Sequence, residues 1–515
     1  MKEDDQSEES ADLSMELSSL LCDLHLSSSL SEKPRPLLPP ITELLSRLQE
    51  KLIDAAEKPS EISSLIGQVE RLVQAAESDW LFSSDSAAQE GGWVELRAAY
   101  VSLISALIGC AALPLCEDDC SSPPTAAYQN IPSRAAAVSS ALTALLRKCE
   151  GGGATRLLHA VAPPICVFAV THFQDQVWTS SSSRAAARRL QEALLTAGHW
   201  TNSAHLLMGD EKNSGILGGV LDVLQPQLTK DSWQRCEAVK LVFAWTLLQV
   251  TRPALSPHLL RLLPPSLVLS DHYRPENCML GVRCLHHIVL NTPAADLRQF
   301  NRAEVLYQAL FKHLYKTEAA VIQLVLPCLL DLLPVLEKPP SSLDPSSSRR
   351  KPCRHDDVLR LVLTHMEAEH KVALRHAYAS ALPLFIDRMG VAVSRHLQRV
   401  ERVLLGYLEV RDPPEEKLRL KMLEVLQKMT RAAWPRMEQR VLVLLRCLLQ
   451  LLVNVSSDSQ LSASARQQLM DQSAACLRLM DACSHGRVQL LLQQVDSSCC
   501  GSEVIGCLAT VMTER

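Results

Sequence analysis

Residues 260–310 read LRLLPPSLVLSDHYRPENCMLGVRCLHHIVLNTPAADLRQFNRAEVLYQAL, and this stretch decides the fold class. Two prolines, Pro264 and Pro265, stand near its start. Because proline cannot donate an amide hydrogen bond, we expect the first helix to end there. The next apolar side chains lie three and four residues apart, which predicts an amphipathic helix with one core-facing side. These are Met279, Val282, Leu285, His286 and Val289. The stretch therefore predicts two helices joined by a turn, followed by the opening of the next unit.

A short motif inside this stretch indicates which class of helical protein the chain belongs to. Asn277, Val282 and Arg283 follow the Asp-x4-Val-Arg spacing of HEAT repeats, with Asn where Asp is usual. The HEAT motif is a rule of packing, unlike a catalytic motif. We therefore expect Leu285 and Val289, on the same helix, to be structural residues that are fully buried.

Length and composition favour a repeat array. The chain has 515 residues, too many for one compact core. Hydrophobic residues make up 47% of it but aromatic residues only 4%, and few alternating patterns suggest strands. Helix pairs recur at roughly 40 residues, the period of HEAT and armadillo arrays. We predict an all-α fold, an α-solenoid of HEAT- or armadillo-like helical hairpins.

Composition also divides the chain into five segments. Residues 1–36 are acidic and rich in serine, so we expect a disordered tail. Residues 338–353 are rich in proline and serine and read as a linker. The other segments are an N-terminal helical region at 37–228, HEAT-like helical repeats at 229–337 and C-terminal helical repeats at 354–515.

One acid interrupts a strongly apolar run. Residues 320–336, AVIQLVLPCLLDLLPVL, are apolar nearly all round, so we expect this helix to be buried and to be kinked or split at Pro327 and Pro334. Asp331 within it is either exposed at a kinked turn or buried with a cationic partner. We favour a paired or capping role, which makes Asp331 a structural residue.

No residue pattern indicates catalysis or a bound cofactor. Cys116 and Cys120 share a loop, but no second Cys or His pair stands nearby at metal-ligand spacing. His286 and His287 lie on adjacent helical faces and cannot both face one ion. The glycine clusters lack the Lys-Ser/Thr end of a phosphate loop. Most of the 17 cysteines lie singly in apolar patterns, which favours free thiols. We expect a non-enzyme with no catalytic, cofactor-binding or metal-binding residues.

Net charge and hydropathy limit the classes of partner that we expect for this chain. The net charge of −5 gives no global basic excess for nucleic acid. The N-terminal MKEDDQSEES lacks the apolar core of a secretory signal, and no run of about 18 uninterrupted apolar residues occurs. We expect no direct contact with nucleic acid or membrane and a cytoplasmic location. Basic residues at 349–351 with Arg354 could add a nuclear signal.

Four runs carry a resemblance to a known family. They are VFAWTLLQVTRPALSPHL at 242–259, LPPSLVLSDHYRPENCMLGVRCLHHIVLNTPAADLRQFNRAEVLY at 263–307, LRLVLTHMEAEHKVALRHAYASALP at 359–383 and RHLQRVERVLLGYLEVRDPPEE at 395–416. These runs look like the Tel-two-interacting protein two family, the small subunit of the Triple T (TTT) cochaperone complex. The resemblance covers roughly residues 160–495.

The resemblance implies a non-enzymatic scaffold subunit with two partners, the telomere-length-regulation protein and the large Tel-two-interacting protein one. It also implies an indirect link to the heat-shock-ninety chaperone and its adaptor complex, which mature phosphatidylinositol-3-kinase-related kinases. Through those kinases the chain would support DNA-damage and growth signalling. Three alternatives stay open: a HEAT-type nuclear-transport receptor, another protein-interaction adaptor and a nucleic-acid-binding solenoid.

The segment 394–416 is our candidate partner interface. Arg395, Arg399 and Arg402 lie four and three residues apart, which predicts a basic stripe along one helical face. Tyr407 lies beside that stripe, and Arg and Tyr are favoured anchors at protein interfaces. An ordinary solvated helix would show the same spacing. We hypothesise that this surface contacts the large Triple T subunit.

Overall fold

The structure is a computed structural model that describes residues 39–55, 58–82, 90–116, 123–149, 155–211, 213–340, 351–495 and 501–513. These residues form α-helices and short 3-10 helices without a strand, and one isolated bridge joins Gly209 to Ser214. The predicted all-α, HEAT-like solenoid class is confirmed. The predicted tail at 1–36 and residues 341–350 of the predicted linker lie outside the described residues.

The chain forms two compact units, residues 1–265 and 266–515. The boundary falls inside helix α12 (Leu259–Ser270). Our sequence-based boundaries at 228/229 and at 338–353 were drawn on composition and stay predictions.

Helix α12 runs through Pro264 and Pro265, so our expectation that these prolines end the helix is wrong. A proline inside a helix costs about 3 kcal/mol. Burying one leucine side chain contributes about 1.5–3 kcal/mol, so a few buried leucines offset that cost. The leucines of α12 that are at most 1% exposed are Leu259, Leu262 and Leu269.

The first unit is built from α-helices and short 3-10 helices. Its helices are α2 (Ile41–Asp54), α3 (Pro59–Ala75), α4 (Ser78–Leu81), α5 (Glu90–Gly109), α6 (Ile131–Lys148), α7 (Thr155–Phe173), α8 (Ser181–Ala197), α9 (Ser203–Met208), α10 (Leu217–Leu224) and α11 (Glu237–Gln249). Helix α7 is central, because α5, α8, α10 and α11 all pack against it.

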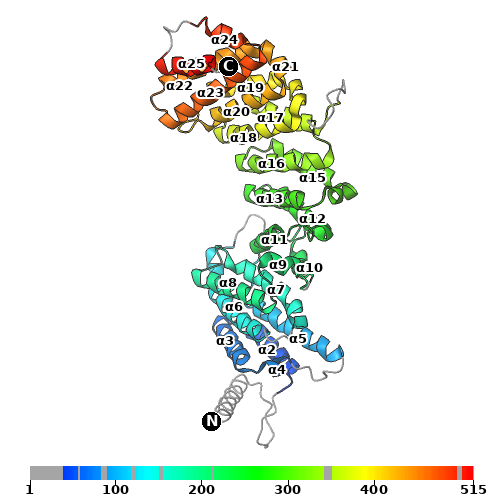
Figure 1. The fold of residues 1–515 in the computed structure, drawn as a ribbon. Helices are drawn as coiled ribbons and strands as arrows, with labels where there is room; N and C mark the ends of the chain where they lie inside the picture. The colour runs from blue at the N-terminus through cyan, green and yellow to red at the C-terminus, as the bar shows by residue number, and fades with distance from the viewer. Residues whose placement is uncertain are drawn as a thin grey trace, which may run out of the picture. The chain divides into compact units, whose positions relative to one another are not determined.

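The second unit stacks helical hairpins in two rows (Figure 1). Row A consists of α15 (Arg302–Lys312), α17 (Arg354–Ala368), α19 (Leu397–Glu409) and α22 (Val441–Ser457). Row B consists of α13 (Pro275–Asn291), α16 (Ala319–Leu336), α18 (Val372–Met389), α20 (Lys417–Ala432), α23 (Ala463–Cys483) and α25 (Ser502–Thr513). Shorter helices are α14 (Ala294–Arg298), α21 (Trp434–Met437) and α24 (Arg487–Leu492).

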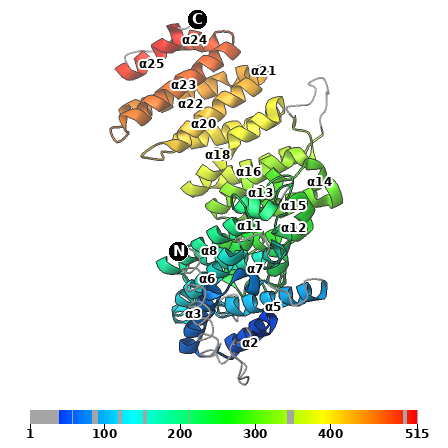
Figure 2. The same cartoon turned by 60° about the horizontal axis from the view of Figure 1, so that its bottom comes forward.

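Each row A helix packs on the row B helix that follows it in sequence. Successive row B helices lie side by side (Figure 2). The row A helices α17, α19 and α22 begin at Arg354, Leu397 and Val441, close to the predicted period of roughly 40 residues. Helix α16 stays continuous through Pro327 and Pro334, so those prolines do not split it.

Helix α19 shows how the sequence selects these contacts. Its core-facing side chains recur every three or four residues, whereas Gln398 and Arg402 between them are exposed. An amphipathic helix of this kind must bury one stripe against its neighbours. The apolar residues of that stripe are Leu397, Val400, Val403, Leu404, Tyr407 and Leu408.

Four helical segments in the described part of the chain have the length and apolar composition that a membrane crossing needs. The share of each segment that is buried inside the fold ranges from 28% to 61%. Our sequence analysis considered only uninterrupted apolar runs, so it named none of these segments as a membrane candidate, although it expected residues 320–336 to form a buried apolar helix. They are Gly92–Gly109, Arg156–Phe173, Ala319–Leu336 and Trp434–Ser457.

Candidate partner-binding surfaces

The predicted basic stripe lies on row A, but its members do different things. Arg399 on α19 donates from Nε and Nη2 to the two carboxylate oxygens of Glu367 on α17, at 3.2 and 3.0 Å. Its Nη1 also donates to the Arg360 carbonyl at 3.2 Å. A bidentate guanidinium–carboxylate pair of this kind fixes the relative orientation of the two side chains and adds to stability. Arg399 therefore holds α19 against α17.

Arg402 and Arg395 differ from Arg399 in exposure. The Arg402 side chain is 66% exposed and its Nη1 lies 3.8 Å from Glu367 Oε1, so solvent screens that pair. Arg395, at the end of the 3-10 helix Gly390–Arg395 before α19, is also exposed. These two arginines form the accessible part of the predicted stripe.

Tyr407 requires a correction, because it is a core residue rather than an exposed anchor. It is 2% exposed, and its hydroxyl donates to the Met366 carbonyl at 3.2 Å. The Arg375 guanidinium lies 3.9 Å from the ring centroid. Burial raises the pKa of Tyr407. Tyr407 is three residues after Leu404, which places it on the buried stripe of α19.

Asp331 on α16 has two cationic or protonatable neighbours. Its Oδ2 lies 3.0 Å from His286 Nε2 on α13, and its Oδ1 lies 3.6 Å from Arg388 Nη2 on α18. The Asp331 side chain is 35% exposed. The carboxylate thus links three consecutive helices of row B at the edge of the core.

The motif helix α13 places its predicted core residues inside. Leu285 is 0% exposed and Val289 4% exposed. Asn277, at the HEAT-motif position, is also buried, and its Nδ2 lies 3.0 Å from His272 Nδ1. Gly281 lets α13 approach the end of α12, because a Cβ there would lie 2.1 Å from the Ser270 nitrogen.

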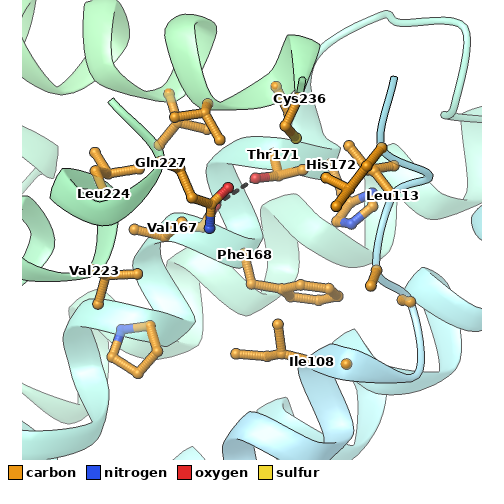
Figure 3. A pocket seen from close by; sticks show the side chains of 18 of the residues that line it. Ile108, Leu113, Val167, Phe168, Thr171, His172, Val223, Leu224, Gln227 and Cys236 are labelled. Carbon is orange, nitrogen blue, oxygen red and sulfur yellow. Dashed lines mark hydrogen bonds between the residues drawn. The ribbon is translucent and has the colours of Figure 1, made fainter. Parts of the chain in front are cut away.

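The first unit contains a groove of about 570 Å³ among α5, α7, α10 and α11 (Figure 3). Most of the side chains labelled in the view are apolar, and Thr171, His172 and Gln227 supply polar atoms. The volume falls in the range of small-molecule and side-chain pockets. The apolar wall includes Ile108, Leu113, Val167, Phe168, Val223 and Leu224.

His172 lines this groove together with a second basic side chain, Arg235. His172 is 1% exposed, and its Nδ1 has no hydrogen-bond partner among the described residues. Burial lowers the pKa of His172 to about 4, so the imidazole is neutral at pH 7.

Comparison with known proteins places the chain among relatives. The sequence model of the Tti2 family matches residues 221–413. A human protein named TELO2-interacting protein 2 is 49% identical over 357 residues, which cover 69% of this chain and 70% of that protein. A mouse protein of the same name is 44% identical over 395 residues, covering 75% and 76%. This chain belongs to the Tti2 family.

Solved structures add little to this family assignment. Yeast importin-beta (Kap95p) is 13% identical, with a TM-score of 0.44 over 93% of this chain and 56% of that one. That TM-score is too low to establish a shared topology. The Tti2-family match spans Asp331 and Arg399 but ends before α22.

One polar cluster of this Tti2-family chain was missing from our sequence analysis. Glu337, Cys353 and His355 place potential metal-ligand atoms within 4.8 Å of one another. These atoms already hydrogen-bond within the fold: His355 Nδ1 lies 2.7 Å from Glu337 Oε1, and Cys353 Sγ donates to Asp356 Oδ2 at 3.3 Å. Burial disfavours the charged Glu337, but hydrogen bonds from His355 outweigh it and lower the pKa of Glu337. Only the Cys-x-His spacing could have signalled this cluster, because Glu337 precedes the linker.

Proposed function

We propose that this chain is a non-enzymatic scaffold subunit of the Triple T cochaperone complex. The observation that carries the proposal is the 49% identity over 357 residues with human TELO2-interacting protein 2. The name of that relative states a binding to TELO2, the telomere-length-regulation protein. The fold supports a binding role, because stacked helical hairpins present long helix surfaces to partner proteins.

The finer part of the proposal concerns the partners and the pathway. We infer that the chain also assembles with the large Tel-two-interacting protein one. The resulting cytoplasmic complex would work with the heat-shock-ninety chaperone and its adaptor complex to stabilise phosphatidylinositol-3-kinase-related kinases. The family resemblance of the four sequence runs supports this part.

Affinity purification of the tagged full-length chain followed by mass spectrometry tests the subunit role. We expect TELO2 and the large subunit in near-stoichiometric amounts. A partner list without either protein would contradict the proposal. A small GTPase together with import cargo would favour the transport alternative instead.

Depletion of the chain tests the pathway. We expect the abundance of phosphatidylinositol-3-kinase-related kinases to fall and re-expression of the wild-type chain to restore it. Unchanged kinase half-lives in depleted cells would contradict the cochaperone role, while leaving the subunit role intact if the complex still forms.

The accessible arginines give a residue-level test of the candidate interface. Arg399 holds α19 to α17 through Glu367, so reversing its charge would disturb the fold as well as any interface. We therefore leave Arg399 unchanged in this test. We expect Arg395→Glu with Arg402→Glu to weaken co-purification of the large subunit at fixed salt, because both side chains are exposed. A thermal melt should stay unchanged. Retention of the large subunit by the double variant would place that interface elsewhere.

A further inference from the structure

Helix α22 exposes apolar side chains where a helix usually presents polar ones. Leu442 is 54% exposed, Val443 44% and Val453 37%. We call this surface the α22 face and define it as Leu442, Val443, Arg446, Leu449, Gln450 and Val453. These residues share one side of the helix, because their spacings follow the helical period. Clustered apolar exposure of this kind marks an interaction site, whereas scattered exposed residues do not.

The α22 face borders a groove of about 370 Å³. Leu491 of α24 lines the opposite side of this groove, and the neighbouring Leu490 is 61% exposed. Leucine side chains therefore contribute to both walls, and Arg446 and Gln450 of α22 also line the groove. The groove is open along α22.

The arrangement of the two rows indicates that a helix would fit this groove. In row A, α17 packs on α19 and α19 packs on α22. The next helix to reach this side is α24, which has six residues against 17 in α22. Among the described residues, no row A helix beyond α19 packs along the remaining roughly three turns, or about 16 Å, of α22, although α25 of row B also contacts this helix.

Charge indicates the chemistry of the missing neighbour. Arg446 lies in the middle of the α22 face and is exposed, and it makes no ion pair within the residues that the structure describes. Arg487, at the start of α24, is also exposed and lacks an ion pair there. A partner carboxylate opposite a guanidinium in an apolar surround would form a strong charge-assisted hydrogen bond.

We propose that the α22 face docks an amphipathic helix from another subunit of the Triple T complex and so continues row A. The docking helix carries apolar side chains three and four residues apart, with an acidic residue opposite Arg446. A second copy of this chain does not fit, because a two-fold self-contact would bring Arg446 toward its own copy. The choice of subunit rests on the proposed function, whereas the helix and its charge rest on the geometry.

Photo-crosslinking tests the proposal in the assembled complex. A benzoylphenylalanine replaces Gln450 in the tagged full-length chain, and a control variant carries it at Leu384, which is 50% exposed on α18 of row B. After irradiation, mass spectrometry identifies the cross-linked peptides. We expect position 450, but not 384, to capture a peptide of TELO2 or of the large subunit that has the stated apolar and acidic spacing.

Charge insertion provides the second measurement. We expect Leu442→Glu with Val453→Glu to reduce co-purification of the captured subunit at least tenfold, whereas Leu384→Glu retains it. Both substitutions change surface residues, so the thermal melts should match the wild type. Arg446→Glu should weaken binding, and Arg446→Lys should preserve most of it.

The outcomes separate the two proposals. If the Triple T subunits co-purify but position 450 captures nothing or only another copy of this chain, the docking proposal is wrong and the subunit role stands. Undiminished binding by Leu442→Glu with Val453→Glu would overturn the docking proposal in the same way. If no Triple T subunit co-purifies with the wild-type chain, the subunit role fails, and the docking proposal fails with it.

Discussion

Asp331 is an acid within a nearly continuous apolar helix, and its partners determine its contribution. A fully buried ion pair broken on one side would cost about 3 kcal/mol or more. Asp331 is 35% exposed, so solvent screens its contacts with His286 and Arg388. We expect Asp331→Val to lower the free energy of unfolding by about 1 kcal/mol. Denaturant unfolding of Asp331→Val, Arg388→Ala and the double variant should give a coupling energy of that size, and a coupling of zero would show that the pair is inert.

Leu285 is the core residue of the motif helix. Because it is 0% exposed, Leu285→Ala should cost about 2–5 kcal/mol through lost burial and a residual cavity. Leu290 on the same helix is 51% exposed and provides a matched control. We expect Leu290→Ala to change the unfolding free energy by less than about 0.5 kcal/mol. Equal effects of the two substitutions would mean that α13 is oriented differently.

His172 makes the stability of the first unit depend on pH. Its pKa of about 4 in the folded chain lies below the ordinary value of 6.5. Between these values the unfolded chain binds a proton that the folded chain does not. The stabilisation is therefore fully present above pH 6.5 and is lost as the pH falls to about 4, by about 3 kcal/mol in total. Denaturant unfolding measured between pH 4 and 6.5 should show that the free energy of unfolding falls more steeply with decreasing pH for the wild type than for His172→Gln. The same pH dependence in both proteins would contradict the assignment.

For individual residues, the sequence predicted which side chains are buried better than it predicted which side chains they contact. The three-and-four spacing was sufficient for Leu285 and Val289. It was insufficient for Arg399, because the carboxylate that binds it belongs to Glu367, 32 positions earlier. Tyr407 was assigned to the wrong side of α19 because its residue type, typical of interfaces, outweighed its position on the apolar stripe.

Glycines show how elements approach one another. A methyl group on Gly281 would meet the Ser270 nitrogen at 2.1 Å and its Cα at 2.5 Å, so α12 and α13 would have to separate. A methyl group on Gly406 of α19 would meet nothing within 4 Å. We expect Gly281→Ala to destabilise the chain by about 1–3 kcal/mol through overpacking. Gly406→Ala should stabilise it by about 0.5–1 kcal/mol, because alanine favours the helix. Thermal melts that moved in the same direction for both variants would contradict the close packing of α12 and α13.

Element boundaries were harder to predict than element types. Proline was expected to stop α12 and to kink or split α16, yet both helices continue through two prolines. The cost of a proline is local, whereas the burial that offsets it comes from neighbouring helices that sequence spacing does not reveal. The row pairing of α19 with α17 and α22 likewise depends on contacts between residues about forty positions apart.

For the whole molecule, the fold class followed from composition and period, because an array repeats one local packing rule. The unit boundary at 265/266 did not follow, since no change in composition marks it. The α22 face also escaped the sequence analysis, because its spacing is that of any buried helix. Whether such a stripe is covered depends on which helices surround it.

Reconstitution tests the central claim, that this chain works by holding other Triple T subunits. The purified full-length chain is mixed with purified TELO2 and the large subunit, and the mixture is analysed by size-exclusion chromatography with light scattering. We expect one peak whose mass equals the sum of the three chains. Separate elution of this chain at its own 56.9 kDa, with the other two subunits complexed or free, would contradict the claim.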